Sequence, residues 1–200
     1  MRGPTSVTPQ ALPQRRPIDF AKATSAVSDL LDALGVNSNR DGLIQTPARV
    51  ARAYAELLTP DPFEATTFAN EEGYDELVVV RDIAFSSLCE HHLLPFSGVA
   101  HVGYLPGERL LGLSKLARVV THFSRRLQVQ ERLTTQVADW LCDTLHPKGV
   151  GVVLEATHAC MSLRGARAAG SVTLTSALGG SVRDDERTRA EFFSLVGCRP

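Results

Sequence analysis

The 200-residue sequence lacks both a net charge and a long apolar run. Lysine and arginine number 21 against 22 aspartates and glutamates, so the formal net charge is −1. Such a balanced chain has no overall attraction for nucleic acid or an anionic membrane, and any anion site must be a local cluster of cations. No apolar stretch approaches the roughly 18 residues of a membrane span, and no secretory signal is recognisable. We therefore expect a cytoplasmic protein with no nucleic-acid and no membrane partner.

Cysteine is also scarce, with four residues at positions 89, 142, 160 and 198. Because no export signal is recognisable, the compartment is expected to be reducing, and metal binding or catalysis is then favoured over disulfide formation. Cys142 lies in an apolar helical pattern and is expected to be a small buried hydrophobic residue.

The N-terminal part is expected to be a helical pair that follows a disordered tail. Residues 1–16 mix Pro, Gln, Ser, Thr and Arg without periodicity, which is typical of disorder. Apolar residues then repeat at helical spacing from Phe20 to Leu34. Thr46 and Pro47 form the start signal, N-cap and first-turn proline, of a second helix that ends near Leu58. The Pro-, Asp- and Gly-rich residues 59–75 are expected to form an irregular connection.

The rest of the chain mixes strands and helices. Apolar and β-branched patterns predict strands near residues 77–85, 99–104, 110–111, 150–158 and 171–176, and helices near 114–127, 131–145 and 185–196. Because these elements come in blocks without strict alternation, we expect an α+β fold with an antiparallel sheet and helices packed on one face. The expected single domain spans 17–200, with a helical part (17–75) and a core (76–200).

Five candidate metal ligands fall in two short segments, residues 89–92 and 158–160. Cys89 and His92 are three residues apart, so both can reach one ion from a helical turn or a tight loop. Cys160 would be the third ligand, brought in by the sheet, because alternation along a strand lets His158 and Cys160 point to one face. Two thiolates and one imidazole with a fourth position open are a known catalytic zinc set. A closed structural site that also uses His91 or His158 is the alternative.

The two remaining histidines of these segments, His91 and His158, are candidate proton carriers. Histidine titrates near neutral pH and is the usual general acid or base. The alternative is that each one only orients a metal ligand through a hydrogen bond. The catalytic role is favoured for His158, and both roles stay open for His91.

A second cluster is basic and could hold a polyphosphate. Lys115 and Arg118 lie one helical turn apart after Ser114, which is expected to cap its helix, and Arg164 follows Cys160 by four residues. Polyphosphates require several converging cations together with N–H donors, which helix starts provide. The alternative is that these side chains are simply solvated surface.

Gln130 and Glu131 lie in a polar stretch between two expected helices. An amide with a carboxylate can recognise the donor edge of a guanine-like ring. Favourable interaction of Glu131 with the dipole of the following helix is an equally good explanation.

Over residues 17–197 the sequence resembles the GTP cyclohydrolase I family. Several long motifs occurring in one order make a chance similarity untenable, although each would be weak alone. The motifs are TPARVA at 46–51, CEHH at 89–92, GLSKLAR at 112–118, QVQERLT at 128–134, EATHACMSLRG at 155–165 and TRAEF at 188–192.

The resemblance implies a tunnelling-fold (T-fold) subunit of a toroidal homodecamer with active sites at subunit interfaces. It implies conversion of GTP and water to 7,8-dihydroneopterin triphosphate and formate, the first step of tetrahydrofolate and pterin biosynthesis. By position, the resemblance implies that the zinc ligands are Cys89, His92 and Cys160, with His91 and His158 as flanking histidines. It implies that ribose and triphosphate are held by Ser114, Lys115, Arg118 and Arg164. The pocket for ribose and guanine would include Gln130 and Glu131.

The mechanism implied by the resemblance begins with a zinc-activated water that attacks guanine C8. His158 would protonate N7 as the imidazole ring opens, and His158 with His91 or Ser114 would supply the acid–base pair for the later ring closure.

Two segments depart from the common family pattern. Residues 84–87 read AFSS where PFYS is frequent, and residues 168–169 read AA where KP is frequent. All expected ligands are retained. Two functions remain as alternatives to this activity. One is a pathway-specific cyclohydrolase with a different product, and the other is a non-catalytic T-fold subunit with a structural zinc.

Overall fold

The computed structural model describes residues 5–7 and 17–197, and the chain divides into two compact units. One unit comprises Leu12–Thr59, and the other comprises Met1–Ala11 together with Pro60–Pro200. The helical part therefore ends at Thr59, earlier than the expected residue 75. Within the described ranges, every helix is too short or too polar to cross a membrane.

The smaller unit contains the two expected helices, α1 (Phe20–Ala33) and α2 (Thr46–Leu57). Asp19 caps α1, because its side chain accepts a hydrogen bond of 2.9 Å from the backbone N–H of Lys22. The expected cap of α2 is wrong in detail. Thr46 is the first helical residue, Gln45 occupies the cap position without a side-chain hydrogen bond, and the proline still lies in the first turn.

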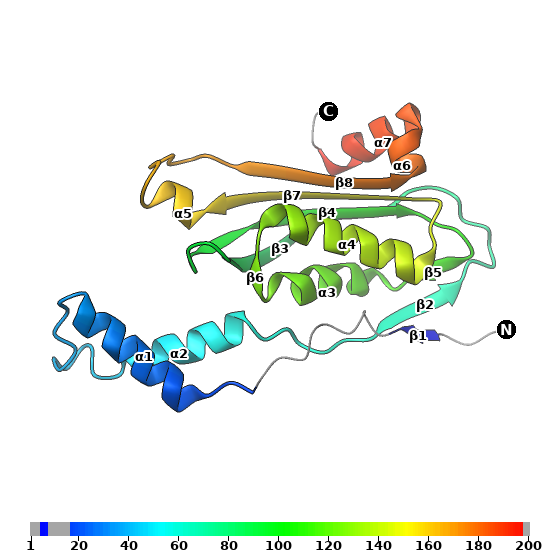
Figure 1. Cartoon of the computed structure of the whole chain (residues 1–200). Helices are drawn as coiled ribbons and strands as arrows, with labels where there is room; N and C mark the ends of the chain where they lie inside the picture. Colours follow the sequence, from blue (N-terminus) through cyan, green and yellow to red (C-terminus); the bar gives the residue numbers. More distant parts are fainter. Residues whose placement is uncertain (1–4, 8–16, 198–200) are drawn as a thin grey trace. The chain divides into compact units, whose positions relative to one another are not determined.

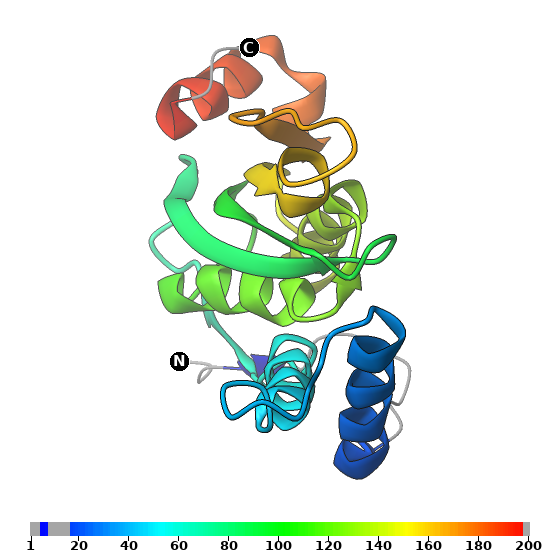
Figure 2. The same ribbon diagram turned by 90° about the vertical axis from the view of Figure 1, so that its left-hand side faces the viewer.

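The larger unit is built on a five-stranded sheet in the order β6-β3-β4-β7-β8 (Figure 1). The strands are β3 (Val78–Cys89), β4 (Pro95–Leu105), β6 (Leu127–Gln128), β7 (Gly149–His158) and β8 (Thr173–Gly180). All neighbours are antiparallel except for the short β6, which runs parallel to β3. The sheet is strongly curved (Figure 2). The expected α+β architecture with an antiparallel sheet is confirmed.

Two long helices, α3 (Leu113–Ser124) and α4 (Gln130–Leu145), pack on the same face of this sheet, as expected (Figure 1). Residues at helical spacing on α3 are buried: Leu116, Val119, Val120 and Phe123. On β7, alternate residues that meet these helices are buried as well: Val150, Val152, Leu154 and Ala156. The helix for which Ser114 was the expected cap has its cap two residues earlier and starts at Leu113. Gly112 occupies its cap position, so Ser114 lies inside the first turn.

The opposite face of the sheet is covered near one end by α7 (Glu186–Val196), which follows the short α6 (Ser181–Asp184). Phe192 is fully buried there against the backbone of two glycines. A Cβ added at Gly151 would lie 2.7 Å from the Phe192 ring, and one at Gly103 would lie 3.0 Å from it. Only glycine on these two strands leaves room for the ring.

A separate small sheet joins β1 (Thr5–Val7), β2 (Ala65–Ala69) and β5 (Arg109–Leu111). β1 falls within the expected disordered tail, whose other residues (1–4 and 8–16) lie outside the described ranges. β2 falls within the expected irregular connection. Its partner β5 is about forty residues away in the sequence, so nothing local to the Thr- and Pro-rich segment indicates the pairing.

Candidate metal centre and active site

Cys89, His92 and Cys160 lie together in the structure, as predicted. One ligand atom from each residue lies within 4.8 Å of the other two, and Cys89 Sγ is 3.9 Å from His92 Nδ1. In a tetrahedral zinc site with ordinary Zn–S and Zn–N bonds, ligand atoms are about 3.6–3.8 Å apart. The spacing and the donor types therefore fit a single metal ion.

A tight turn at the end of β3 brings His92 back beside Cys89. The Cys89 N–H donates to Leu94 O, and the Leu93 N–H donates to Cys89 O, each at 2.9 Å. Leu93 adopts a left-handed backbone conformation with φ 55°, which costs a non-glycine residue about 1–2 kcal/mol. The turn therefore holds the two ligands together at some cost in backbone strain.

Cys160 reaches the group from a helix and not from the strand. β7 ends at His158, and Cys160 lies in the short α5 (Ala159–Ser162). The expectation that strand alternation carries Cys160 is therefore wrong, because the chain turns helical directly after His158. Burial raises the pKa of the Cys160 thiol, and the neighbouring Cys89 raises it further, since two adjacent thiolates repel each other. A cation bound between them would remove that repulsion.

His158 is held in one orientation at the end of β7. Its ring stacks on Phe96 of β4 with the ring centroids 4.6 Å apart and the planes within 3° of parallel. Its Nε2 lies 2.7 Å from Gln130 Oε1. Burial lowers the pKa of His158, while the charge of Glu131 acts in the opposite direction. The expected proton carrier is thus a fixed imidazole two residues before Cys160, a candidate metal ligand.

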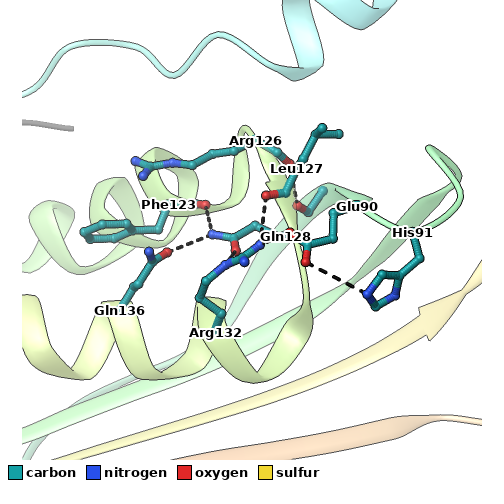
Figure 3. A network of polar contacts seen from close by, with 9 residues as sticks. Glu90, His91, Phe123, Arg126, Leu127, Gln128, Arg132 and Gln136 are labelled. Carbon is teal, nitrogen blue, oxygen red and sulfur yellow. Dashed lines mark hydrogen bonds and ion pairs between the residues drawn. The ribbon is translucent and has the colours of Figure 1, made fainter. Parts of the chain in front are cut away.

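The turn that carries Cys89 and His92, the candidate metal-binding turn, is tied to α4 by an ion pair between Glu90 and Arg132 (Figure 3). Arg132 also donates from Nε to Gln128 Oε1 at 2.9 Å and from a terminal nitrogen to Leu127 O at 3.2 Å. The hydrogen bond from Arg132 holds the pKa of Glu90 below its usual range. One guanidinium therefore links the turn, β6 and α4.

Gln128 anchors this network in the interior, where it is 1% exposed. Its amide donates to Phe123 O and to Gln136 Oε1, each at 2.8 Å (Figure 3). Its backbone carbonyl accepts from the Glu90 N–H at 3.0 Å. These bonds satisfy a buried amide, which would otherwise be costly, and they fix the segment on which the candidate metal-binding turn rests.

His91 lies on the solvent side of the same turn. Its side chain is 65% exposed, and its Nε2 is 3.9 Å from Glu90 Oε1. The His91 ring is 6.3 Å from the His92 ring between centroids. His91 is thus close to the metal ligands without being one of the three grouped atoms.

The expected cationic residues lie on two separate elements. Ser114, Lys115 and Arg118 are on the first turns of α3, and Arg164 follows α5. Arg118 and Arg164 are exposed and Lys115 is partly exposed. Within the described ranges, none of the three forms an ion pair. A cavity of about 390 Å³ beside Arg118 is lined by Asp61, Pro62, Phe63, Thr121 and His122, and by no metal ligand.

Gln130 and Glu131 begin α4 and face different surroundings. Glu131 is exposed. Gln130 is only 2% exposed, and its amide nitrogen lies within 3.1 Å of Leu154 O, Thr173 O and Thr175 Oγ1. The side-chain nitrogen and oxygen of Gln130 therefore form their hydrogen bonds within the chain.

The residue pattern gave no role to Phe96, Glu90 or Arg132. Phe96 meets His158 because the two are register partners on β4 and β7. Arg132 meets Glu90 because β6 pairs with β3. Both contacts depend on long-range register. The signal that could have found Arg132 is its spacing of four residues from Gln128, to which it donates a hydrogen bond.

Comparison with known proteins places the chain in a family. The sequence model of the GTP cyclohydrolase I family matches residues 23–197. The chain is 53% identical to GTP cyclohydrolase 1 of Rhodopirellula baltica over 182 residues, which cover 90% of this chain and 80% of that protein. It is 50% identical to that of Mycobacterium avium over 201 residues, 98% of each chain, and 53% identical to that of Streptomyces coelicolor over 186 residues, 90% and 92% of the two chains. The expected T-fold class is thereby confirmed, and the chain belongs to the GTP cyclohydrolase I family.

Proposed function

We propose that the protein hydrolyses GTP and rearranges it to 7,8-dihydroneopterin triphosphate, with release of formate. The observation that carries the proposal is the Cys89, His92 and Cys160 group beside the fixed imidazole of His158. The names of the relatives support GTP as the substrate. On this proposal the reaction opens tetrahydrofolate and pterin biosynthesis, and because GTP is a cytoplasmic metabolite the protein works in the cytoplasm.

Zn²⁺ is the metal that best fits the donor set. Two thiolates and one imidazole are soft and borderline ligands, which zinc accepts in a tetrahedral arrangement, and three protein ligands leave one position for water or substrate. When bound, zinc supplies Lewis-acid activation of water at neutral pH.

The side chains of the protein supply the proton transfers. Addition of water at guanine C8 places electron density on N7, and His158 delivers a proton there as the imidazole ring of the substrate opens. The later ribose rearrangement and ring closure require an acid–base pair. His158 acts in this pair with His91 or Ser114, both of which are exposed enough to meet a substrate.

The exposed cations and Glu131 bind the two ends of GTP. Lys115, Arg118 and Arg164 make charge-assisted hydrogen bonds to the triphosphate, and the amide groups at the start of α3 add uncharged donors. Glu131 accepts the donor edge of guanine, because its carboxylate is exposed at the start of α4.

The active subunit works in a homo-oligomer, a decamer with sites at its interfaces. The family membership supports this assembly, as do the exposed cations, which no acidic group of the described chain neutralises. β8 is an edge strand with β7 as its neighbour in the sheet order, so its outer backbone groups are available to a further chain.

The test is to incubate the purified protein with GTP and to measure formate together with a fluorescent pterin after oxidation. Formate and pterin in equal amounts are expected. Formate without pterin would identify a cyclohydrolase with a different product, and neither product would identify a binding subunit with a structural metal.

A further inference from the structure

The hydrogen bonds around Gln130 run in one direction and end at the imidazole of His158. The Gln130 amide nitrogen contacts Leu154 O at 3.1 Å and Thr173 O at 2.9 Å. Carbonyl oxygens only accept hydrogen bonds, so the atom that faces them must be the NH₂ group. The amide therefore cannot be flipped, and its oxygen is the atom that faces His158 at 2.7 Å.

Two threonine hydroxyls take part in the same set of buried hydrogen bonds. The Thr134 hydroxyl donates to the backbone carbonyl oxygen of Gln130 at 2.8 Å. It lies 2.6 Å from the Thr175 hydroxyl, which must therefore donate to it and is left to accept from the Gln130 NH₂ group at 3.1 Å. The two hydrogens of the Gln130 NH₂ group thus face three acceptors, and a flipped amide would set its oxygen against two carbonyl oxygens.

The direction of these bonds determines which ring nitrogen of His158 carries hydrogen. Gln130 Oε1 can only accept, so His158 Nε2 must be the donor. In the uncharged imidazole the lone pair is then on Nδ1. No described residue forms a hydrogen bond with Nδ1, while the stacking of the ring on Phe96 opposes a ring flip that would put Cε1 in the place of Nε2.

We propose that Gln130 is a positioning residue that fixes the tautomer of His158, so that Nδ1 exchanges protons with the substrate while Nε2–H stays bound to Gln130. Its link to catalysis rests on the proposed function. A proton that Nδ1 accepts from the attacking water is the one that it returns to N7, so His158 ends the step as it began. This role differs from direct contact with ribose or guanine, for which a side chain 2% exposed is poorly placed.

The first test reads the tautomer and needs no substrate. The protein is labelled with ¹⁵N-histidine and loaded with zinc, and the attached hydrogens are located in solid-state ¹⁵N spectra. Six histidines are present, and the His158 signals are those missing from the His158→Asn variant. Hydrogen on Nε2 with a bare Nδ1 is the expected result. Hydrogen on Nδ1 would overturn the proposal, whether or not the protein turns over GTP.

The second test separates positioning from substrate contact. Gln130→Leu removes the acceptor for Nε2–H while keeping the volume of the side chain. We expect kcat for formate release to fall at least about 10-fold, because a mobile or wrongly protonated imidazole is a poor catalyst, with KM for GTP within about 3-fold of wild type. The ¹⁵N spectrum of this variant should show both tautomers.

A matched control is Thr135→Ala on the same helix, whose hydroxyl bonds only to the Glu131 carbonyl of its own helix. It should keep wild-type kcat and the wild-type His158 spectrum. A Gln130→Leu variant with raised KM, unchanged kcat and a single His158 tautomer would overturn the positioning role and assign Gln130 to the substrate. If this variant does not fold, the wild-type spectrum still decides the tautomer. Absence of formate from the wild-type protein would refute the proposed function alone.

Discussion

The metal group (Cys89, His92 and Cys160) and the cationic group (Lys115, Arg118 and Arg164) differ in how completely one chain builds them. The metal group rests on a strand end, a strained turn and a buried polar network, and its donor atoms already lie within 4.8 Å of one another. The cationic side chains are exposed or partly exposed and form no ion pair within the described ranges.

This contrast follows from what each ligand demands. A metal ion tolerates errors of only about 0.2 Å in its ligand distances, so the protein must place the donor atoms before binding. A triphosphate is large, flexible and highly charged, and long cationic side chains can close on it after arrival. Four experiments test whether the two groups are independent in this way.

The largest effect is expected for Cys160→Ala. Loss of one thiolate should abolish stable metal binding, and formate release from GTP should fall by about 10³-fold or more. Zinc content and formate are measured on the same sample. Cys142→Ala is the matched control, since Cys142 lies outside the metal group and should keep both. Full formate release from a metal-free Cys160→Ala protein would rule out a catalytic metal.

His158→Ala should separate metal binding from chemistry. The zinc content is expected to stay at the wild-type level, because His158 is not one of the three grouped ligands, while kcat falls by about 10²- to 10⁴-fold through loss of the general acid–base group. Loss of zinc in this variant would make His158 a ligand and favour the closed structural site.

Arg132→Gln tests whether the polar network supports the metal group. It removes the ion pair to Glu90, and we expect zinc affinity, measured by competition with a chelator, to weaken by about 10- to 100-fold. Arg125→Gln is the control, because it also breaks an ion pair, of 3.4 Å to Asp61, but one that involves no residue of the turn. Equal zinc affinities in the two variants would show that the turn needs no support from α4.

The smallest effect is expected for Lys115→Ala. This variant should bind zinc like the wild type and raise KM for GTP by about 3- to 10-fold, since water and salt screen an exposed cation. The difference from wild type should shrink at high salt. Lys148→Ala, at an exposed lysine outside the cationic group, should change neither quantity. An altered zinc affinity in Lys115→Ala would show that the two groups are coupled.

The parts of the site that the sequence predicted are those that local chemistry determines. Cys89 and His92 are three residues apart, and residue type alone marks them as ligands. The inward-facing amide of Gln130 and the contact of Phe96 with His158 depend on which strands pair and in which register. No pattern within one segment contains that information.

The same division holds for the fold. The helices of the smaller unit follow from apolar periodicity and start signals, and they were predicted to within a few residues. β2 was missed because β5, about forty residues away, supplies its hydrogen-bonding partner. Cys160 was placed on a strand because the alternation of β7 gives no sign that the chain becomes helical at Ala159.

The packing of Phe192 against Gly103 and Gly151 affects the other end of β4 and β7, where His158 lies. These two glycines are register partners, and seven residues further along the pair lies the partnership of Phe96 with His158. Seven residues of strand span about 23 Å. A slip of one residue would turn His158 toward the other side of the sheet. Packing of the C-terminal helix α7 thus helps to keep β4 and β7 in register. A bulky side chain at either glycine would displace the imidazole of His158 without contacting it.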